Sequence, residues 1–140
     1  MSSPGHPSVD LLRVARDVEL AVARVLEPHG LTLRKYGILR ELGEVPGLSA
    51  TELARRQRTT VDDLRLLLRS LTDVGLVSHA ASGSGHEPLL ALSRAGSATL
   101  TAVDAALTAL DADLFADDER AALAAAVAAV VAEPVREPQD

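Results

Sequence analysis

TELARRQRTTVDDLRLLLRSLTDVGLVSHA, residues 51–80, is the stretch that decides the fold. Ser49, just before it, and Glu52 have the spacing of a capping box, which predicts the start of a short helix. After a tight turn, Thr60 can cap a second helix over 61–74, and Gly75 suits the left-handed residue that ends a helix. Apolar residues repeat along one side of this second helix, at Val61, Leu64, Leu67, Leu68 and Leu71.

A β-hairpin is predicted directly after the second helix. LVSHA (76–80) and PLLALS (88–93) have the composition of short strands, and ASGSGHE between them reads as a flexible hairpin tip. A short helix, a tight turn, a longer helix and a hairpin form a winged helix-turn-helix. The predicted fold class is therefore mainly α with a small β-hairpin wing.

Long helices are predicted on both sides of this unit. VDLLRVARDVELAVARVLEPHG (9–30) has an apolar arc wider than one neighbouring helix requires, which indicates burial against a second chain. LTLRKYGILRELGEVPG (31–47) predicts another helix with Thr32 as its N-cap. Ser93 can cap a long helix, and an alanine-rich helix follows the acidic turn FADDE. The apolar stripe of the long helix comprises Leu100, Val103, Leu107, Leu110 and Leu114.

These patterns predict a single domain that forms a homodimer. We predict a dimerisation helix at 9–30, a winged helix-turn-helix lobe at 31–94 and C-terminal dimerisation helices at 95–132. The polar, proline-bearing ends, 1–8 and 133–140, are predicted to be disordered tails.

The charge is distributed unevenly along the chain. The net charge is −6 at pH 7, and residues 95–140 hold nine acidic and two basic side chains. Residues 48–94, which contain the helix-turn-helix, hold six basic and five acidic side chains. A nucleic-acid binder usually has a clear basic patch, so the electrostatic signal for DNA binding is weak.

Composition argues against several other classes of protein. The chain has no cysteine, and its four histidines include no pair at helical spacing, so we expect no metal site. No nucleophile motif or glycine-rich phosphate loop is present, so we expect no cofactor, and the sequence offers no motif that would identify an enzyme. No apolar run approaches the roughly 20 residues of a membrane span, and the N-terminus lacks the pattern of a signal peptide. We therefore expect a cytoplasmic protein.

The chain resembles the MarR family of bacterial transcriptional regulators over about residues 10–132. The resemblance is strongest in residues 51–80, and LALSRAG (90–96) and LTLRKYGILREL (31–42) add to it. The matching positions in the strongest part are Leu53, Ala54, Leu64, Leu68, Leu71, Gly75, Leu76 and Val77.

The resemblance implies a homodimer that joins through its terminal helices. It places two recognition helices in successive major grooves of double-stranded DNA and the wings beside the minor groove. It also implies a pocket for a small aromatic or hydrophobic effector between the dimer layer and the DNA-binding lobe. Candidate pocket residues are Arg16, Tyr36 and Arg40. Tyr36 can hydrogen-bond or stack on a ligand, although a role as a core-edge aromatic is an equal alternative.

The side of the 61–74 helix opposite its core carries Asp62, Arg65, Leu66 and Arg69. The family typically has an arginine where this chain has Leu66, often a glycine where it has Arg58, and an arginine in the wing, where this tip has only His86. We therefore expect weak, strongly salt-dependent DNA binding. The candidate DNA-contacting residues are Arg55, Arg56, Arg58, Thr60, Asp62, Arg65, Arg69 and His86.

Asp62 and Asp63, at the leading end of the helix, have three interpretations. They can stabilise the helix N-terminus through its dipole, an aspartate can accept a hydrogen bond from cytosine, or this face no longer contacts DNA. The sequence does not decide among these three interpretations.

The sequence thus predicts a ligand-responsive DNA-binding regulator. One alternative is a homodimer of the same fold that has lost DNA binding and binds or transforms a small hydrophobic molecule. Acid–base groups for that reaction would be Asp62, Asp63, His86 or Tyr36. Another alternative is a protein that sequesters a DNA-binding relative, which the exposed Leu66 suits modestly.

Overall fold

The computed structural model describes residues 5–80 and 86–133. The chain begins with α1 (Pro7–Leu26), the 3-10 turn η1 (Glu27–His29) and α2 (Leu33–Glu44). The helix-turn-helix is α3 (Ala50–Arg56) and α4 (Val61–Asp73), and the hairpin is β1 (Val77–Ala80) and β2 (Leu89–Leu92). Two further helices follow, α5 (Arg94–Leu114) and α6 (Asp118–Ala132). This order and the mainly α fold class with one hairpin confirm the prediction.

The first helix differs from its predicted bounds at both ends. It begins at Pro7, so residues 7 and 8 are helical and not part of a disordered tail. Proline suits this position because the first turn of a helix needs no amide donor. At the other end the α-helix stops at Leu26, and the chain continues as η1 to Gly30, whose φ of 70° closes the turn. The remaining predicted tail positions, 1–4 and 134–140, lie outside the described residues.

Side-chain caps start most of the helices at the predicted positions. The Thr32 hydroxyl accepts a hydrogen bond from the Lys35 amide, Ser49 from Glu52 and Thr60 from Asp63. Ser93 caps α5 by accepting from the Gly96 amide. Each such bond satisfies an amide that has no partner inside its helix, so short polar side chains fix where the helices begin.

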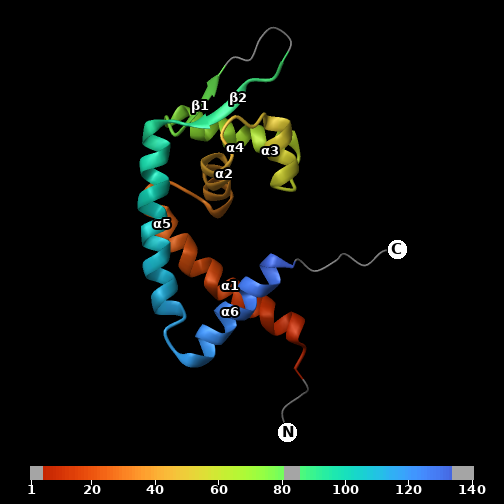
Figure 1. Cartoon of the computed structure of the whole chain (residues 1–140), viewed down its shortest axis with the longest axis vertical. Coiled ribbons are helices and arrows are strands. Elements are labelled where there is room, and N and C mark those ends of the chain that lie inside the picture. Colours follow the sequence, from red (N-terminus) through yellow and green to blue (C-terminus); the bar gives the residue numbers. More distant parts are fainter. Residues whose placement is uncertain (1–4, 81–85, 134–140) are drawn as a thin grey trace, which may run out of the picture.

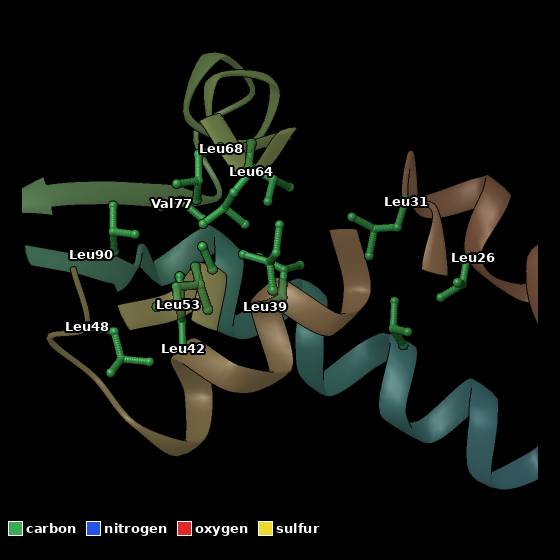
Figure 2. Packing of buried hydrophobic residues seen from close by; sticks show 14 residues of the cluster. Leu26, Leu31, Leu39, Leu42, Leu48, Leu53, Leu64, Leu68, Val77 and Leu90 are labelled. Carbon is green, nitrogen blue, oxygen red and sulfur yellow. The ribbon is translucent and has the colours of Figure 1, made fainter. Parts of the chain in front are cut away.

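The core of the lobe is made of leucines from the helix-turn-helix and from α2 (Figure 2). Leu64, Leu68 and Leu71 of α4 are buried, as predicted, whereas Val61 and Leu67 are half-buried and pack against the same cluster. Burial of each leucine side chain stabilises the fold by about 1.5–3 kcal/mol. The other buried members are Leu26, Leu31, Ile38, Leu39, Leu42, Leu48, Leu53, Ala54, Val77, Leu90 and Val103.

The hairpin is antiparallel and pairs Val77 with Leu92 and His79 with Leu90. Leu90 also bridges to Leu48, whose carbonyl accepts from the Leu90 amide at 2.8 Å. This bridge ties β2 to the segment that leads into α3. Most of the predicted hairpin tip, residues 81–85, lies outside the described residues.

The winged lobe lies at one end of α5, and α1 and α6 lie toward the other end (Figure 1). There α1 and α6 expose large apolar side chains, among them Leu12 and Val131, which are 69% and 74% exposed. Among the residues that the structure describes, no helix is long and apolar enough to cross a membrane.

Candidate DNA-binding face and interhelical cavity

The outer face of α4 is built as the sequence predicts. Burial of Leu64, Leu68 and Leu71 fixes the inner side of the helix, so Asp62, Arg65, Leu66 and Arg69 project into solvent on the other side. Leu66 is 67% exposed. The face therefore offers two arginines, one aspartate and one apolar side chain to whatever binds it.

The aspartates at the start of α4 support the helix itself. Asp62 and Asp63 lie in the first turn, where the helix dipole favours negative charge. The Asp63 amide is the donor to the Thr60 cap, at 3.2 Å. Asp62 Oδ1 lies 4.0 Å from Arg65 Nη1, and both side chains are largely exposed. An exposed ion pair of that length contributes little, so Arg65 stays available to an anionic partner.

Three candidate arginines around the turn differ in their surroundings. Arg56 Nη1 donates to Glu41 Oε1 of α2 at 2.9 Å, which holds its charge against the neighbouring helix. Arg55 and Arg58 are exposed. Arg58 has a φ of 52°, the left-handed region that glycine adopts without strain. The backbone at Arg58 thus has a conformation that glycine adopts freely, at a position where the family often has glycine.

The base of the wing is attached to α3 by the carboxylate of Glu87, which was not among the predicted site residues. Thr51 Oγ1 donates to Glu87 Oε1 at 2.7 Å, and the Thr51 amide lies 3.4 Å from Oε2. The hydrogen bond from the Thr51 side chain lowers the pKa of Glu87. His86, the predicted wing contact, is exposed beside it. Glu87 lies close to the helix-turn-helix only because of the hairpin register, which local sequence does not encode.

A hollow of about 360 Å³ separates α4 from the hairpin. Leu68 and Leu90 form apolar parts of its lining, and Arg65, Arg69 and Glu87 lie around it. On the same face, Thr72 Oγ1 lies 3.0 Å from His79 Nε2, which links the last turn of α4 to β1. Helix α4 and the hairpin are thus joined at one end and line the same hollow.

A second, larger hollow of about 690 Å³ lies between α1, α2 and α5. Tyr36 and Arg40 line it, as predicted for a ligand pocket, but Arg16 does not. Arg16 is exposed on α1, outside the walls of this cavity. The lining residues are Val22, Leu33, Tyr36, Arg40, Gly43, Glu44, Leu100, Asp104, Leu107, Thr108 and Asp111.

Tyr36 spans this cavity from α2 to α5. Its hydroxyl donates to Asp104 Oδ1 at 2.7 Å. Burial, together with the hydrogen bond and the negative charge of Asp104, raises the pKa of Tyr36 to about 12. Asp104 was not a predicted site residue, although Asp104 and Asp111 are seven residues apart and so share one face of α5.

Three consecutive side chains at the start of α2 reach three different elements. Arg34 Nη2 donates to Thr59 Oγ1 in the turn before α4, at 3.2 Å. Lys35 Nζ donates to Ser70 Oγ of α4 at 2.9 Å. Tyr36 contacts α5 through Asp104. The first turns of α2 therefore connect the cavity directly to α4.

In the part of the chain that the structure describes, no group of three or more histidine, aspartate or glutamate side chains is arranged to hold a metal ion.

Comparison with known proteins identifies close relatives of the chain, although no family model matches it. An HTH-type transcriptional repressor of Mycobacterium tuberculosis, Rv2887, is 38% identical over 103 residues, which is 68% of this chain and 74% of the relative. The solved structure of this MarR family protein in complex with DNA has a TM-score of 0.70 and 33% identity, covering 81% of this chain and 85% of that one. Its complex with salicylic acid has a TM-score of 0.65 and 34% identity, covering 83% and 87%.

Proposed function

The chain belongs to the MarR family of winged helix-turn-helix transcriptional regulators, and from this premise we propose that it regulates transcription by binding double-stranded DNA in a ligand-dependent manner. The observation that carries the proposal is the outer face of α4, whose arginines point into solvent. A solved structure of a relative is a complex with DNA. A regulator of bacterial DNA acts in the cytoplasm, where we expect this chain.

The DNA contacts are assigned by charge and exposure. Arg65 and Arg69 lie on α4 itself, at positions that enter the major groove when a recognition helix docks. Arg55 and Arg58 flank the turn and suit phosphate contacts. Thr60 and His86 complete the face, whereas Arg56 contributes less because its guanidinium is engaged by Glu41. Asp62 lies beside these cations and weakens the attraction to phosphate.

The functional unit is a homodimer that joins through α1, α5 and α6. The support is the apolar surface that α1 and α6 expose in the single chain, including Leu11, Leu12, Val127, Val130 and Val131. Large apolar side chains that gather on exposed helices suit an interaction surface. A two-fold axis through these helices would place two α4 helices about one helical turn of DNA apart, roughly 34 Å.

The interhelical cavity is the proposed effector site. A relative binds salicylic acid, and the cavity of this chain combines the Tyr36 ring with leucine side chains, which suits a small aromatic molecule. A ligand that displaces the Tyr36–Asp104 bond would alter the position of α2. Because Lys35 and Arg34 of α2 hold Ser70 and Thr59, the change would reach α4.

The proposal is tested in two steps on the full chain. Light scattering measures the oligomeric state, and Leu12→Asp, which places a charge in the exposed apolar surface of α1, should convert a dimer to a monomer. An electrophoretic mobility shift with DNA from the chain's own upstream region, beside a scrambled duplex, then measures specific binding. If the unmodified chain is a monomer and binds neither duplex, the proposal is contradicted.

A further inference from the structure

The interhelical cavity has an apolar side that can hold an aromatic or aliphatic body. Val22 of α1, Leu33 of α2 and Leu100 and Leu107 of α5 line it together with the ring of Tyr36. Tyr36 contributes a π-face, which attracts cations as well as apolar groups. The apolar lining alone leaves the charge of a ligand undecided.

The charged groups of the cavity are mostly acidic. One cation, Arg40, lines it, against the three carboxylates of Glu44, Asp104 and Asp111. With Tyr36 neutral, one positive and three negative charges leave the cavity with two net negative charges at pH 7. These groups come from α2 and α5, and α1 contributes only Val22.

The single cation is already engaged by one of the acids. Arg40 Nε lies 3.4 Å from Glu44 Oε1, one turn along α2. Asp104 accepts the Tyr36 hydroxyl, which leaves its negative charge in place. The side-chain carboxylate of Asp111 has no hydrogen-bond or ion-pair partner among the residues that the structure describes. A carboxylate ligand would therefore meet the two acids of α5, and the one counter-charge, Arg40, is exposed and shared with Glu44.

The wider surroundings have the same sign. Apart from Asp104 and Asp111, residues 95–133, which include most of α5 and all of α6, hold five acidic side chains and one basic side chain. A wall with one sign of charge raises the local concentration of ligands with the opposite charge. This second observation is independent of the side chains that line the cavity.

We propose that the interhelical cavity selects small organic cations, with an aromatic or apolar body and a protonated amine, over carboxylates such as the salicylic acid bound by the relative. The body packs against Tyr36 and the leucines, and the ammonium lies between Asp104 and Asp111. The inference rests on the proposed function, because it specifies the effector of the same site.

The test is isothermal titration calorimetry of the full chain with three molecules of one frame: naphthylmethylamine, naphthylmethanol and naphthoate. Salicylic acid serves as a fourth probe. The amine should bind at least about 10-fold more tightly than naphthoate, with the alcohol between them, because two nearby carboxylates act on opposite charges. The preference should shrink as salt screens the charges.

Matched variants test whether Asp104 and Asp111 cause the preference for the amine. Asp104→Asn and Asp111→Asn should each lower the affinity for the amine about 3- to 10-fold and leave the alcohol nearly unchanged. Asp113→Asn removes the same charge from the same helix at a position that does not line the cavity. It should leave all affinities within about twofold, and thermal melts of each variant confirm that the fold persists.

Two outcomes would overturn the inference. One is tighter binding of naphthoate or salicylic acid than of the amine, and the other is no binding of any probe. In both cases the regulator itself is judged separately, by whether the ligand-free protein binds its upstream DNA. If the amine binds as predicted but the ligand-free protein binds no DNA, the ligand class stands and the proposed function fails.

Discussion

Tyr36 on α2 and Asp104 on α5 are joined across the interhelical cavity by a hydrogen bond of 2.7 Å from hydroxyl to carboxylate. The two residues are 68 positions apart in the chain. Lys35, next to Tyr36, is bonded to α4. The bond therefore lies on a short route from the cavity to the recognition helix.

The titration of Tyr36 reports on its burial and on this bond together. The folded chain raises the pKa of Tyr36 from 10.0 to about 12. The phenol proton is thus held more tightly in the folded state, so its contribution to stability is complete below pH 10 and is lost as the pH rises through about 12. Tyr36 is the only tyrosine, so tyrosinate absorbance reports on it alone.

The Asp104→Asn variant should move that midpoint down toward 10.0, because it removes the charge that opposes ionisation. Circular dichroism recorded alongside restricts the comparison to the pH range in which each chain is folded. Equal midpoints for the native and the urea-unfolded chain would show that the bond does not form in solution.

Asp62→Asn should strengthen DNA binding about two- to fivefold at low salt. The substitution removes a negative charge that lies near the phosphates and beside Arg65. The measurement is the dissociation constant for the upstream duplex and for a scrambled one. A loss of affinity confined to duplexes with one particular G·C pair would instead identify Asp62 as a reader of cytosine.

Arg58→Gly should stabilise the fold by up to about 1.5 kcal/mol. A left-handed residue other than glycine costs about 1–2 kcal/mol, and the greater freedom of glycine in the unfolded chain offsets about 0.5–1 kcal/mol of that gain. Urea denaturation measures the difference. Arg58→Lys, which keeps the charge and the strain, is the control, and equal stability of the glycine and lysine variants would contradict the observed φ of 52°.

Gly96→Ala should destabilise the fold by more than about 2 kcal/mol. An added Cβ would lie 2.0 Å from the backbone carbonyl oxygen of Leu76, which cannot move without displacing the hairpin. Gly43→Ala is the control, because its Cβ would meet the end of the flexible Leu100 side chain at 2.8 Å. Thermal melts of both variants make the comparison, and similar losses would argue against the close approach at Gly96.

The sequence was sufficient for features that depend on neighbouring residues. The caps at Thr32, Ser49, Thr60 and Ser93 and the buried leucines of α4 were predicted because their signals lie within one or two helical turns. The same applies to the exposed face of Asp62, Arg65, Leu66 and Arg69. Once the inner side of α4 is fixed, helical geometry determines its outer side.

Contacts between distant segments were beyond such reasoning. Asp104 and Glu87 became site residues only through the packing of α5 on α2 and the register of the hairpin. Arg56 matched a DNA contact by composition, yet the crossing of α3 and α2 brings it to Glu41. Arg16 was assigned to the pocket from its place on the first helix, but its side chain lies outside the cavity walls. Whether a side chain of α1 faces the cavity depends on how the helix is turned about its own axis. The broad apolar arc of α1 does not determine that orientation.

The most direct test of the account is fluorescence anisotropy of the full chain with labelled upstream DNA and a scrambled duplex across a salt series. We expect tighter binding to the upstream duplex and a linear fall of log affinity with log salt. Arg65→Ala and Arg69→Ala should each reduce that slope by about two per dimer, and Arg56→Ala, held by Glu41, by less. Equal binding to both duplexes, or none at low salt, would contradict a role in DNA recognition.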